Sequence, residues 1–430
     1  MIPKSHTTSP GNEMRGTCPT SQIPPEKGEE LLADARRALA EGENFRAYDL
    51  AEAVPDGQSP WKIFVMSLAL ARSGSTRRAR ELAAMLPEIG DTPFMESEFA
   101  GLKGRLCKDM AQLTADPGER RKCLISAADA YAVGFQRTPN YYNGINAASC
   151  RFLAGARNEA RLLVREKVLP LCEAEKSRDL WLVATLAECR LLLGDFATAA
   201  ALYREAIDMA FSARRLGDFT STLRQLRLLA YEIGPEADAV AASLPLPCVA
   251  IFSGHMIDAP GRPTPRFPPE AEESVRLRLR KAILARRIAF GYASCACGGD
   301  ILFLEEVLAS GGRVVIAPPL PLEKAIRQSV DFAPGDWTAR LRAILSNPSA
   351  ILLDAESDES GDNDNLVYDF CNRYLFGLAL LKARETSFPL RGICVWNGTR
   401  SGLPGGTDSA VDCWRSAGVE TDIIAPMETF

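Results

Sequence analysis

The fold is decided by the stretch CVAIFSG at 248–254, followed by IAFGYASCACGGD at 288–300 and RVVIAPP at 313–319. Each segment begins with an apolar run that fits a buried strand, and a charged helical segment, Glu270 to Ala285, separates the first two. Strands that alternate with helices build a parallel, doubly wound sheet, whose ligands bind at the carboxyl ends of the strands. Because the first two runs end in glycine, that edge favours a phosphate-bearing ligand.

The C-terminal part of the chain continues the same pattern. Apolar runs at 350–353, 392–396 and 419–425 predict three more strands, with helical segments between them. The predicted class is therefore α + α/β, in which a Rossmann-like doubly wound sheet over residues 248–430 follows a helical region.

Residues 28–243 are predicted to be helical almost throughout, in helices of about 10–20 residues separated by short turns. The clearest repeat, Trp181 to Phe211, spaces small and large apolar residues as a tetratricopeptide repeat (TPR) does. Such a solenoid presents an extended surface to a protein partner, whereas an irregular helical bundle is the alternative. Residues 1–27 are predicted to be a disordered tail and 244–247, LPLP, a stiff linker.

Composition excludes several classes of partner. The chain has 430 residues, with 50 Lys and Arg against 55 Asp and Glu, and no basic run, so we expect no nucleic-acid partner. No apolar stretch approaches the roughly 18 residues of a membrane span, and the N-terminal segment lacks the apolar core of a signal peptide. The expected location is the cytoplasm, without membrane contact.

The sequence predicts no metal site and no disulfide framework. The 12 cysteines are scattered, as expected of small buried apolar residues in a cytoplasmic chain. Cys295 and Cys297 form the one tight pair, and His6 and His255 are the only histidines, too few ligands for zinc. The acidic run from Asp354 to Asp364 is interpreted as a solvated loop, with a divalent cation site as the alternative.

One helical segment resembles a known family. Residues 140–148, NYYNGINAA, resemble the Tyr-x-Gly-Ile-Asn-Ala motif of the TPR-like region called the TRAF-binding domain, found in apoptosis signal-regulating kinases and in bacterial signalling proteins. The likeness runs from about Ala100 to Gly234 and implies a helical scaffold rather than catalysis. From the residues alone, Asn146 is expected to be a buried polar residue that caps or bridges a turn.

Four loops leave the carboxyl ends of predicted strands and should converge at one edge of the sheet. Arginine there can bind phosphate through two nitrogens, and Thr407 is expected to cap the following helix. Turn geometry is the alternative role for the glycines, and a favourable helix-dipole contact is the alternative to a ribose contact for Asp300. The candidate ligand-binding residues are Ser253, Gly254, His255, Asp258, Arg262, Arg266, Ser294, Gly298, Gly299, Asp300, Pro318, Asn397, Gly398, Gly405, Gly406 and Thr407.

The α/β region resembles the SLOG superfamily, the Smf/DprA and LOG group of Rossmann-like proteins, and especially its bacterial members fused to TPR regions. The likeness lies in the order of elements, in CGGD at 297–300 and in PGGT at 404–407. It implies a pocket for a nucleotide or an NAD-derived ligand. LOG enzymes cleave phosphoribose from nucleotides with a Pro-Gly-Gly-x-Gly-Thr-x-x-Glu motif, whose third glycine is absent here. Asp412 and His255 are the remaining catalytic candidates.

These patterns favour a signalling protein without deciding whether it is also an enzyme. Its Rossmann-like region would bind a nucleotide-like small molecule and its helical array a protein partner. The alternative is a LOG-like hydrolase that cleaves an N-glycosidic bond of a nucleotide or an NAD-type substrate. An inward carboxylate, Asp300 or Asp412, beside Gly254 and Gly298 would favour hydrolysis.

Overall fold

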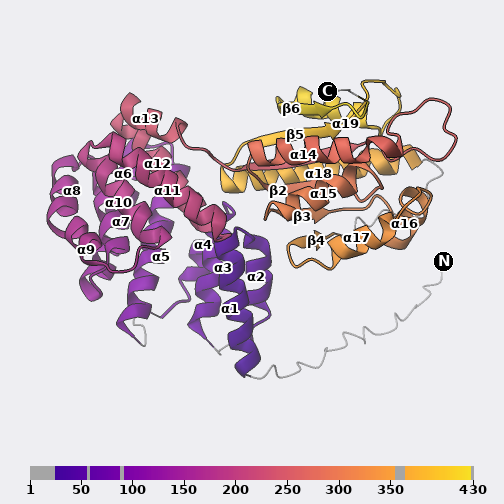
Figure 1. Cartoon of the computed structure of the whole chain (residues 1–430). Helices are drawn as coiled ribbons and strands as arrows, with labels where there is room; N and C mark the ends of the chain where they lie inside the picture. Colours follow the sequence, from indigo (N-terminus) through magenta and orange to yellow (C-terminus); the bar gives the residue numbers. More distant parts are fainter. Residues whose placement is uncertain (1–24, 56–58, 88–91, 354–363, 428–430) are drawn as a thin grey trace, which may run out of the picture.

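The computed structural model describes residues 25–55, 59–87, 92–353 and 364–427, which form a helical array followed by an α/β region (Figure 1). Of the tail expected up to residue 27, residues 1–24 lie outside the described ranges, and Pro25–Lys27 belong instead to the first helix. The acidic run at 354–364 also lies outside the description, except that Asp364 begins helix α18.

The helical array confirms the TPR-like organisation, because each helix packs against the next along the chain. In the hairpin of α10 and α11, Gly194 turns the chain with φ +87°. The small residues Ala187 and Ala199 are fully buried where these helices meet. The helices of the array are α1 (Pro25–Glu41), α2 (Asn44–Glu52), α3 (Pro60–Arg72), α4 (Thr76–Ala83), α5 (Pro93–Leu113), α6 (Pro117–Arg137), α7 (Tyr141–Leu153), α8 (Arg157–Leu163), α9 (Leu169–Ala174), α10 (Leu180–Leu193), α11 (Phe196–Ser212), α12 (Leu216–Ile233) and α13 (Pro235–Ala242).

Two segments of the array differ from the sequence prediction. A single helix is predicted over residues 158–172, but a π-helical turn, η1 (Val164–Val168), separates α8 from α9. Pro170 has no N–H to donate to the preceding turn, which is a physical reason for the wider turn. Helix α13 lies inside the predicted helical region, 28–243, but is not predicted as a separate helix, since the last one expected ends at Glu232. Helix α13 follows Gly234 and carries Pro235 in its first turn, a favourable start.

The α/β region is a six-stranded parallel sheet in the order β4-β3-β2-β1-β5-β6. The chain moves outward from β1 through β2, β3 and β4, then returns to the other side of β1 with β5. The strand order therefore reverses between β1 and β5, the place where doubly wound sheets form their ligand crevice. The strands are β1 (Cys248–Gly254), β2 (Ile288–Ala293), β3 (Arg313–Ile316), β4 (Ala350–Leu352), β5 (Leu390–Val395) and β6 (Thr421–Ile424).

Helices cover both faces of the sheet. Ala250 and Ile288 face the buried apolar cluster formed with α14 (Glu272–Ala285), α15 (Gly299–Ala309), α16 (Leu322–Ser329) and α17 (Trp337–Leu345). Val249 and Phe290 face α18 (Asp364–Thr386) and α19 (Thr407–Ser416). A short 3-10 turn, η2 (Pro269–Ala271), precedes α14. Among the described helices, none combines the length and apolar character that crossing a bilayer requires.

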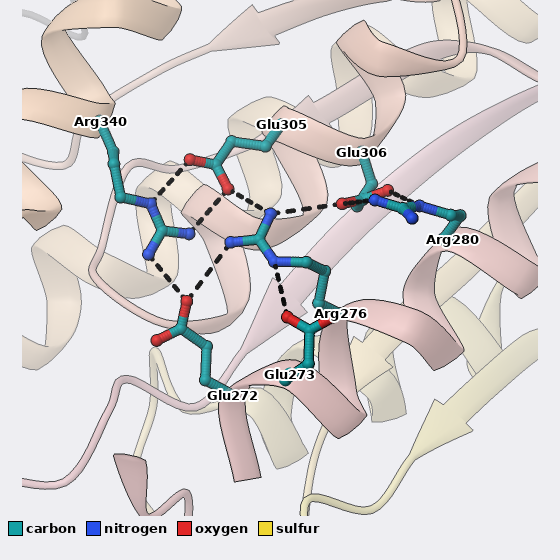
Figure 2. A network of polar contacts seen from close by, with 7 residues as sticks. All are labelled: Glu272, Glu273, Arg276, Arg280, Glu305, Glu306 and Arg340. Carbon is teal, nitrogen blue, oxygen red and sulfur yellow. Dashed lines mark hydrogen bonds and ion pairs between the residues drawn. The ribbon is translucent and has the colours of Figure 1, made fainter. Parts of the chain in front are cut away.

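A network of arginines and glutamates ties α14 to α15 and α17 (Figure 2). Arg276 on α14 pairs with Glu305 over 2.9 Å, and Glu305 also accepts from Arg340 on α17 over 2.7 Å. Glu306 is buried and accepts from Arg280 over 2.7 Å. Each acidic group therefore contacts at least one guanidinium, which fixes three helices on one face of the sheet. The seven members are Glu272, Glu273, Arg276, Arg280, Glu305, Glu306 and Arg340.

The helical array and the α/β region share one buried core. Residues of α12 and α18, such as Leu226 and Leu375, belong to the same apolar cluster. Polar contacts also cross this junction. Arg287 lies 2.9 Å from Asp208, and Arg313 pairs with Glu41. The linker at 244–247 therefore joins two regions that already pack against each other.

Candidate functional site

A cavity of about 310 Å³, called here the sheet-edge cavity, opens at the carboxyl ends of β1 and β5. This volume lies within the range of about 300–1,000 Å³ in which small ligands bind. The cavity brings together nine of the predicted site residues: Ser253, Gly254, His255, Arg266, Ser294, Asp300, Gly405, Gly406 and Thr407.

Asp258 and Arg262 shape the loop after β1 instead of lining the cavity. The carboxylate of Asp258 accepts hydrogen bonds from the backbone N–H groups of Arg266 (2.7 Å) and Phe267 (2.9 Å). Arg262 lies 3.3 Å from the same carboxylate. Asp258 therefore holds the proline-rich excursion in a conformation that brings Arg266 to the cavity.

Gly298 and Gly299 allow two loops to approach each other closely. Gly298 has φ +83°, and a Cβ there would lie 2.6 Å from the backbone nitrogen of Ile257. The N–H of Gly299 donates to the carbonyl of His255 over 3.0 Å. Both glycines thus lock the β1 loop onto the start of α15 and lie outside the lining. Pro318, Asn397 and Gly398 are also outside it, whereas the adjacent Pro319 lines the cavity.

His255 is buried in the cavity wall. Its Nε2 lies 3.0 Å from Oδ1 of Asn397, an oxygen that also accepts from the backbone N–H of Thr399 over 3.0 Å. Burial lowers the pKa of His255, and the positive charge of Arg266 acts in the same direction. The neutral ring therefore donates from Nε2, which leaves Nδ1 as an acceptor.

Asp300 is a buried carboxyl group in the same cavity. Its Oδ2 accepts from the backbone N–H of Ala296 over 3.1 Å. Burial raises the pKa of Asp300 to about 7, although hydrogen bonds from the backbone of Ala296 and Gly254 act in the opposite direction. A carboxyl group that titrates near neutral pH can either donate or accept a proton.

Arg266 and Arg400 are the two arginines of the cavity wall, and Arg400 is already paired with Asp412. The Nε of Arg266 is buried and finds no hydrogen-bond partner among the residues that the structure describes. Burial lowers the pKa of the Arg266 guanidinium, and the nearby Arg262 adds to this effect. A guanidinium held in this way favours an anionic partner.

The loop before α19 is held by Asp408. This carboxylate accepts from the backbone N–H of Ser401 (2.9 Å) and of Gly402 (3.1 Å). The prediction that Thr407 caps the helix is wrong, because Gly406 occupies the cap position and Thr407 is the first helical residue. Asp412 lies on the exposed side of α19, where it pairs with Arg400 over 2.8 Å, outside the cavity lining.

Sequence reasoning missed the contribution of α18. Tyr368, Cys371 and Asn372 line the sheet-edge cavity, together with Trp396 after β5. Cys371 donates its thiol hydrogen to the carbonyl of Ala317 over 3.1 Å, which positions this part of α18 over the end of β3. No local pattern marks these positions, because they meet the cavity only through tertiary packing.

The cysteines of the described residues are all free, including Cys295 and Cys297. Within the same residues, His, Cys, Asp and Glu side chains form no group of three or more that could hold a metal ion. Asn146 lies within α7 and caps nothing, since Asn140 caps this helix by accepting from the N–H of Asn143. Asn146 bridges helices instead, accepting from Lys108 on α5 over 3.2 Å.

Comparison with known proteins supports the helical part of this description. The model of a family described as Tetratricopeptide Repeats-Sensor (TPR-S) matches residues 45–151. The matched segment is similar to TPR-type sensor regions, and this similarity suggests a role in protein interaction or sensing. It lies N-terminal to the repeat at 181–211 that is clearest in the sequence. No curated protein matches the chain.

Two solved structures are similar to parts of the chain. The thermophilic TPR protein TTC0263 of Thermus thermophilus is 18% identical, with a TM-score of 0.37, over 47% of this chain and 98% of that chain. LpoA of Haemophilus influenzae is 11% identical, with a TM-score of 0.23, over 91% of this chain and 82% of that chain.

Proposed function

We propose that this is a signalling protein that binds a nucleotide-derived anion in the sheet-edge cavity and a protein partner on its helical array. Arg266 carries the proposal, because its buried Nε lacks a hydrogen-bond partner in the described part of the chain and its charge favours a phosphate. The placement of the cavity at the reversal of strand order supports the same conclusion.

The other wall residues suit the rest of such a ligand. His255 and Asp300 can each exchange hydrogen bonds with sugar hydroxyl groups, and Trp396 and Tyr368 offer aromatic surface for a base. We assign ligand binding to residues 248–430 and partner binding to residues 28–243, an organisation like that of SLOG proteins fused to TPR or TRAF-binding-domain-like regions.

A thermal-shift screen tests this assignment, since a ligand that binds only the folded state raises its melting temperature. AMP, ATP, NAD, ADP-ribose and cyclic dinucleotides are the probes. We expect at least one to stabilise the wild type and to lose its effect in Arg266→Ala. Arg327→Ala is the matched control, because Arg327 is an exposed arginine of α16 that lies outside the lining. If no probe raises the melting temperature, or if both variants respond like the wild type, the proposal is wrong.

Hydrolysis of an N-glycosidic bond is the second candidate, and the buried Asp300 favours it. A carboxyl group with a pKa of about 7 beside a ligand cavity suits general acid or base catalysis. Chromatography of each bound probe after incubation with the protein tests this function. Turnover that is lost in Asp300→Asn while the thermal shift remains would establish an enzyme. A probe recovered intact from the wild type would leave the sensor role alone.

A further inference from the structure

A second cavity, of about 330 Å³, lies where the helical array meets the C-terminal end of α18. We call it the junction cavity. Its walls come from the array, with Lys108 of α5, Tyr142 of α7 and Arg224 of α12 among them, and from Arg384 of α18. It shares no lining residue with the sheet-edge cavity. Its size also suits a small organic ligand.

Two of the cations around the junction cavity are neutralised by carboxylates. Arg72 lies 3.1 Å from Asp218, and both side chains are buried. Arg105 lies 3.4 Å from Asp109. These pairs neutralise part of the positive charge at the cavity, but other cationic side chains also face it.

Three further cations face the junction cavity without a carboxylate at ion-pair distance in the described part of the chain. Lys108 donates only to neutral amide oxygens, at 2.9 Å to Gln225 and 3.2 Å to Asn146. Arg224 donates only to backbone carbonyls, those of Arg72 (3.2 Å) and Glu385. For Arg384, the described residues provide neither a hydrogen bond nor an ion pair.

The remaining carboxylates of the lining do not balance these cations. Glu385 pairs over 2.9 Å with Lys382, which lies outside the lining. Glu188 accepts from Gln225 over 2.9 Å and from Ser149, and its burial raises the pKa of the carboxyl group. Burial lowers the pKa of Arg224 to about 10, and the charge of Arg105 adds to this effect. The cavity therefore holds a surplus of positive charge that its own walls leave uncompensated.

We propose that the junction cavity is a second ligand site, which binds a small phosphate-bearing organic anion through Lys108, Arg224 and Arg384. Guanidinium and ammonium groups are the side chains that proteins use for phosphate. The rings of Tyr142 and Trp181, 5.7 Å apart and nearly perpendicular, form an aromatic wall for the organic part of the ligand. This site is separate from the sheet-edge cavity and adds a second small-molecule ligand to the proposed function.

The proposal also gives a role to the sequence motif at 140–148. Tyr142, Ile145 and Asn146 of that motif line the junction cavity. Asn146 holds Lys108 through its side-chain oxygen, while its amide nitrogen donates to the carbonyl of Tyr142 over 2.9 Å. The motif thus positions both an aromatic wall and a cation, in addition to building the scaffold.

Isothermal titration of the full chain with AMP and with inorganic pyrophosphate tests the site. Arg384→Glu reverses an exposed charge that has no partner to lose among the described residues, so this variant should fold normally. We expect it to weaken AMP binding at least tenfold, and Lys108→Gln to weaken it by a similar factor. Arg121→Glu, the same charge reversal at an exposed position of α6 outside the lining, is the matched control and should bind like the wild type.

The sheet-edge variant Arg266→Ala separates this proposal from the preceding one. Binding that survives Arg266→Ala but is lost in Arg384→Glu and Lys108→Gln places the probe in the junction cavity. Binding that is lost only in Arg266→Ala places it in the sheet-edge cavity and overturns the present proposal while supporting the other. Absence of binding of both AMP and pyrophosphate at millimolar concentration also overturns it. Pyrophosphate binding without AMP binding overturns the assignment of an organic ligand, because the aromatic wall would then contribute nothing to binding.

Discussion

The ammonium group of Lys382 donates to the backbone carbonyl of Gly42 over 2.7 Å, although the two residues are 340 positions apart. Gly42 ends α1 with φ +86°, and Lys382 lies in α18. The same ammonium lies 2.9 Å from Glu385 and 3.6 Å from Glu43. One buried cation therefore joins the first helical hairpin of the array to the α/β region.

Replacing this cation should destabilise the whole chain. Lys382→Met keeps the apolar stem but leaves the mostly buried carboxylate of Glu385 without its ion-pair partner, whereas Glu43 keeps Arg313 at 3.9 Å. We therefore expect the unfolding free energy to fall by about 3–5 kcal/mol. Urea denaturation measures the change. Lys281→Met removes an exposed lysine from α14 and should change stability by less than about 0.5 kcal/mol. A loss of similar size in both variants would contradict the proposed role of the contact.

Two glycines in helices should respond to alanine with opposite signs. A Cβ at Gly217 of α12 would lie against the carbonyl of Leu39 and 2.6 Å from Cα of Gly42, so Gly217→Ala should cost about 1–3 kcal/mol. A Cβ at Gly377 of α18 would meet nothing within 4 Å. Gly377→Ala should therefore stabilise the protein by about 0.5–1 kcal/mol, because alanine favours helices. Thermal and urea unfolding of both variants would show whether α1 and α12 approach as closely as described.

The arginine–glutamate network contains a matched pair of test positions. Glu306 is buried and contacts both Arg276 and Arg280, so Glu306→Ala should lower the unfolding free energy by about 1–3 kcal/mol. Glu273 is largely exposed and lies 3.7 Å from Arg276, so Glu273→Ala should change it by less than about 0.5 kcal/mol. If both variants lost the same unfolding free energy in urea denaturation, the burial of a glutamate would not determine how much its contacts stabilise the protein.

Asp300 should make stability depend on pH. Burial raises its pKa from 3.8 to about 7 on folding, so the folded protein binds more protons than the unfolded chain between these values. The contribution of Asp300 to the unfolding free energy therefore decreases as pH rises from about 4 to about 7. Asp300→Asn cannot ionise and lacks this decrease. Its stability relative to the wild type should rise across that window and level off above it.

Urea denaturation at several pH values between about 4.5 and 8 measures this difference. Asp412→Asn serves as the control, because Asp412 is an exposed acid paired with Arg400. A difference between Asp300→Asn and wild type that does not change with pH would show that the Asp300 carboxyl group titrates normally.

The sheet could be predicted from the sequence because its strands are short apolar runs between glycines and charged segments. The predicted strand at 288–293 coincides with β2, and the expected class, α + α/β, is confirmed. The ends of the helices in the array were harder to predict. The π-helical turn at Val164–Val168 and helix α13 depend on local hydrogen bonding that apolar periodicity does not register.

Only those parts of the candidate site that follow from the strand topology could be predicted from the sequence. Loops after parallel strands converge, which placed His255, Arg266 and Asp300 together. The sequence could not distinguish a glycine that contacts a ligand from Gly298, whose absent side chain makes room for Ile257. Nor could it find Tyr368 and Asn372, or the junction cavity, because α18 meets both places only through tertiary packing.

Helix α18 contributes Asn372 to one cavity and Arg384 to the other, about 18 Å further along the same helix axis. A helix transmits a shift along its axis far better than a loop does. If an occupant of the sheet-edge cavity displaces α18 so that Arg384 moves, the affinity of the junction cavity for its ligand changes, and linkage requires the reverse effect to be equal in size. The protein would then respond to two ligands at once, because α18 would couple the occupancy of each cavity to the affinity of the other.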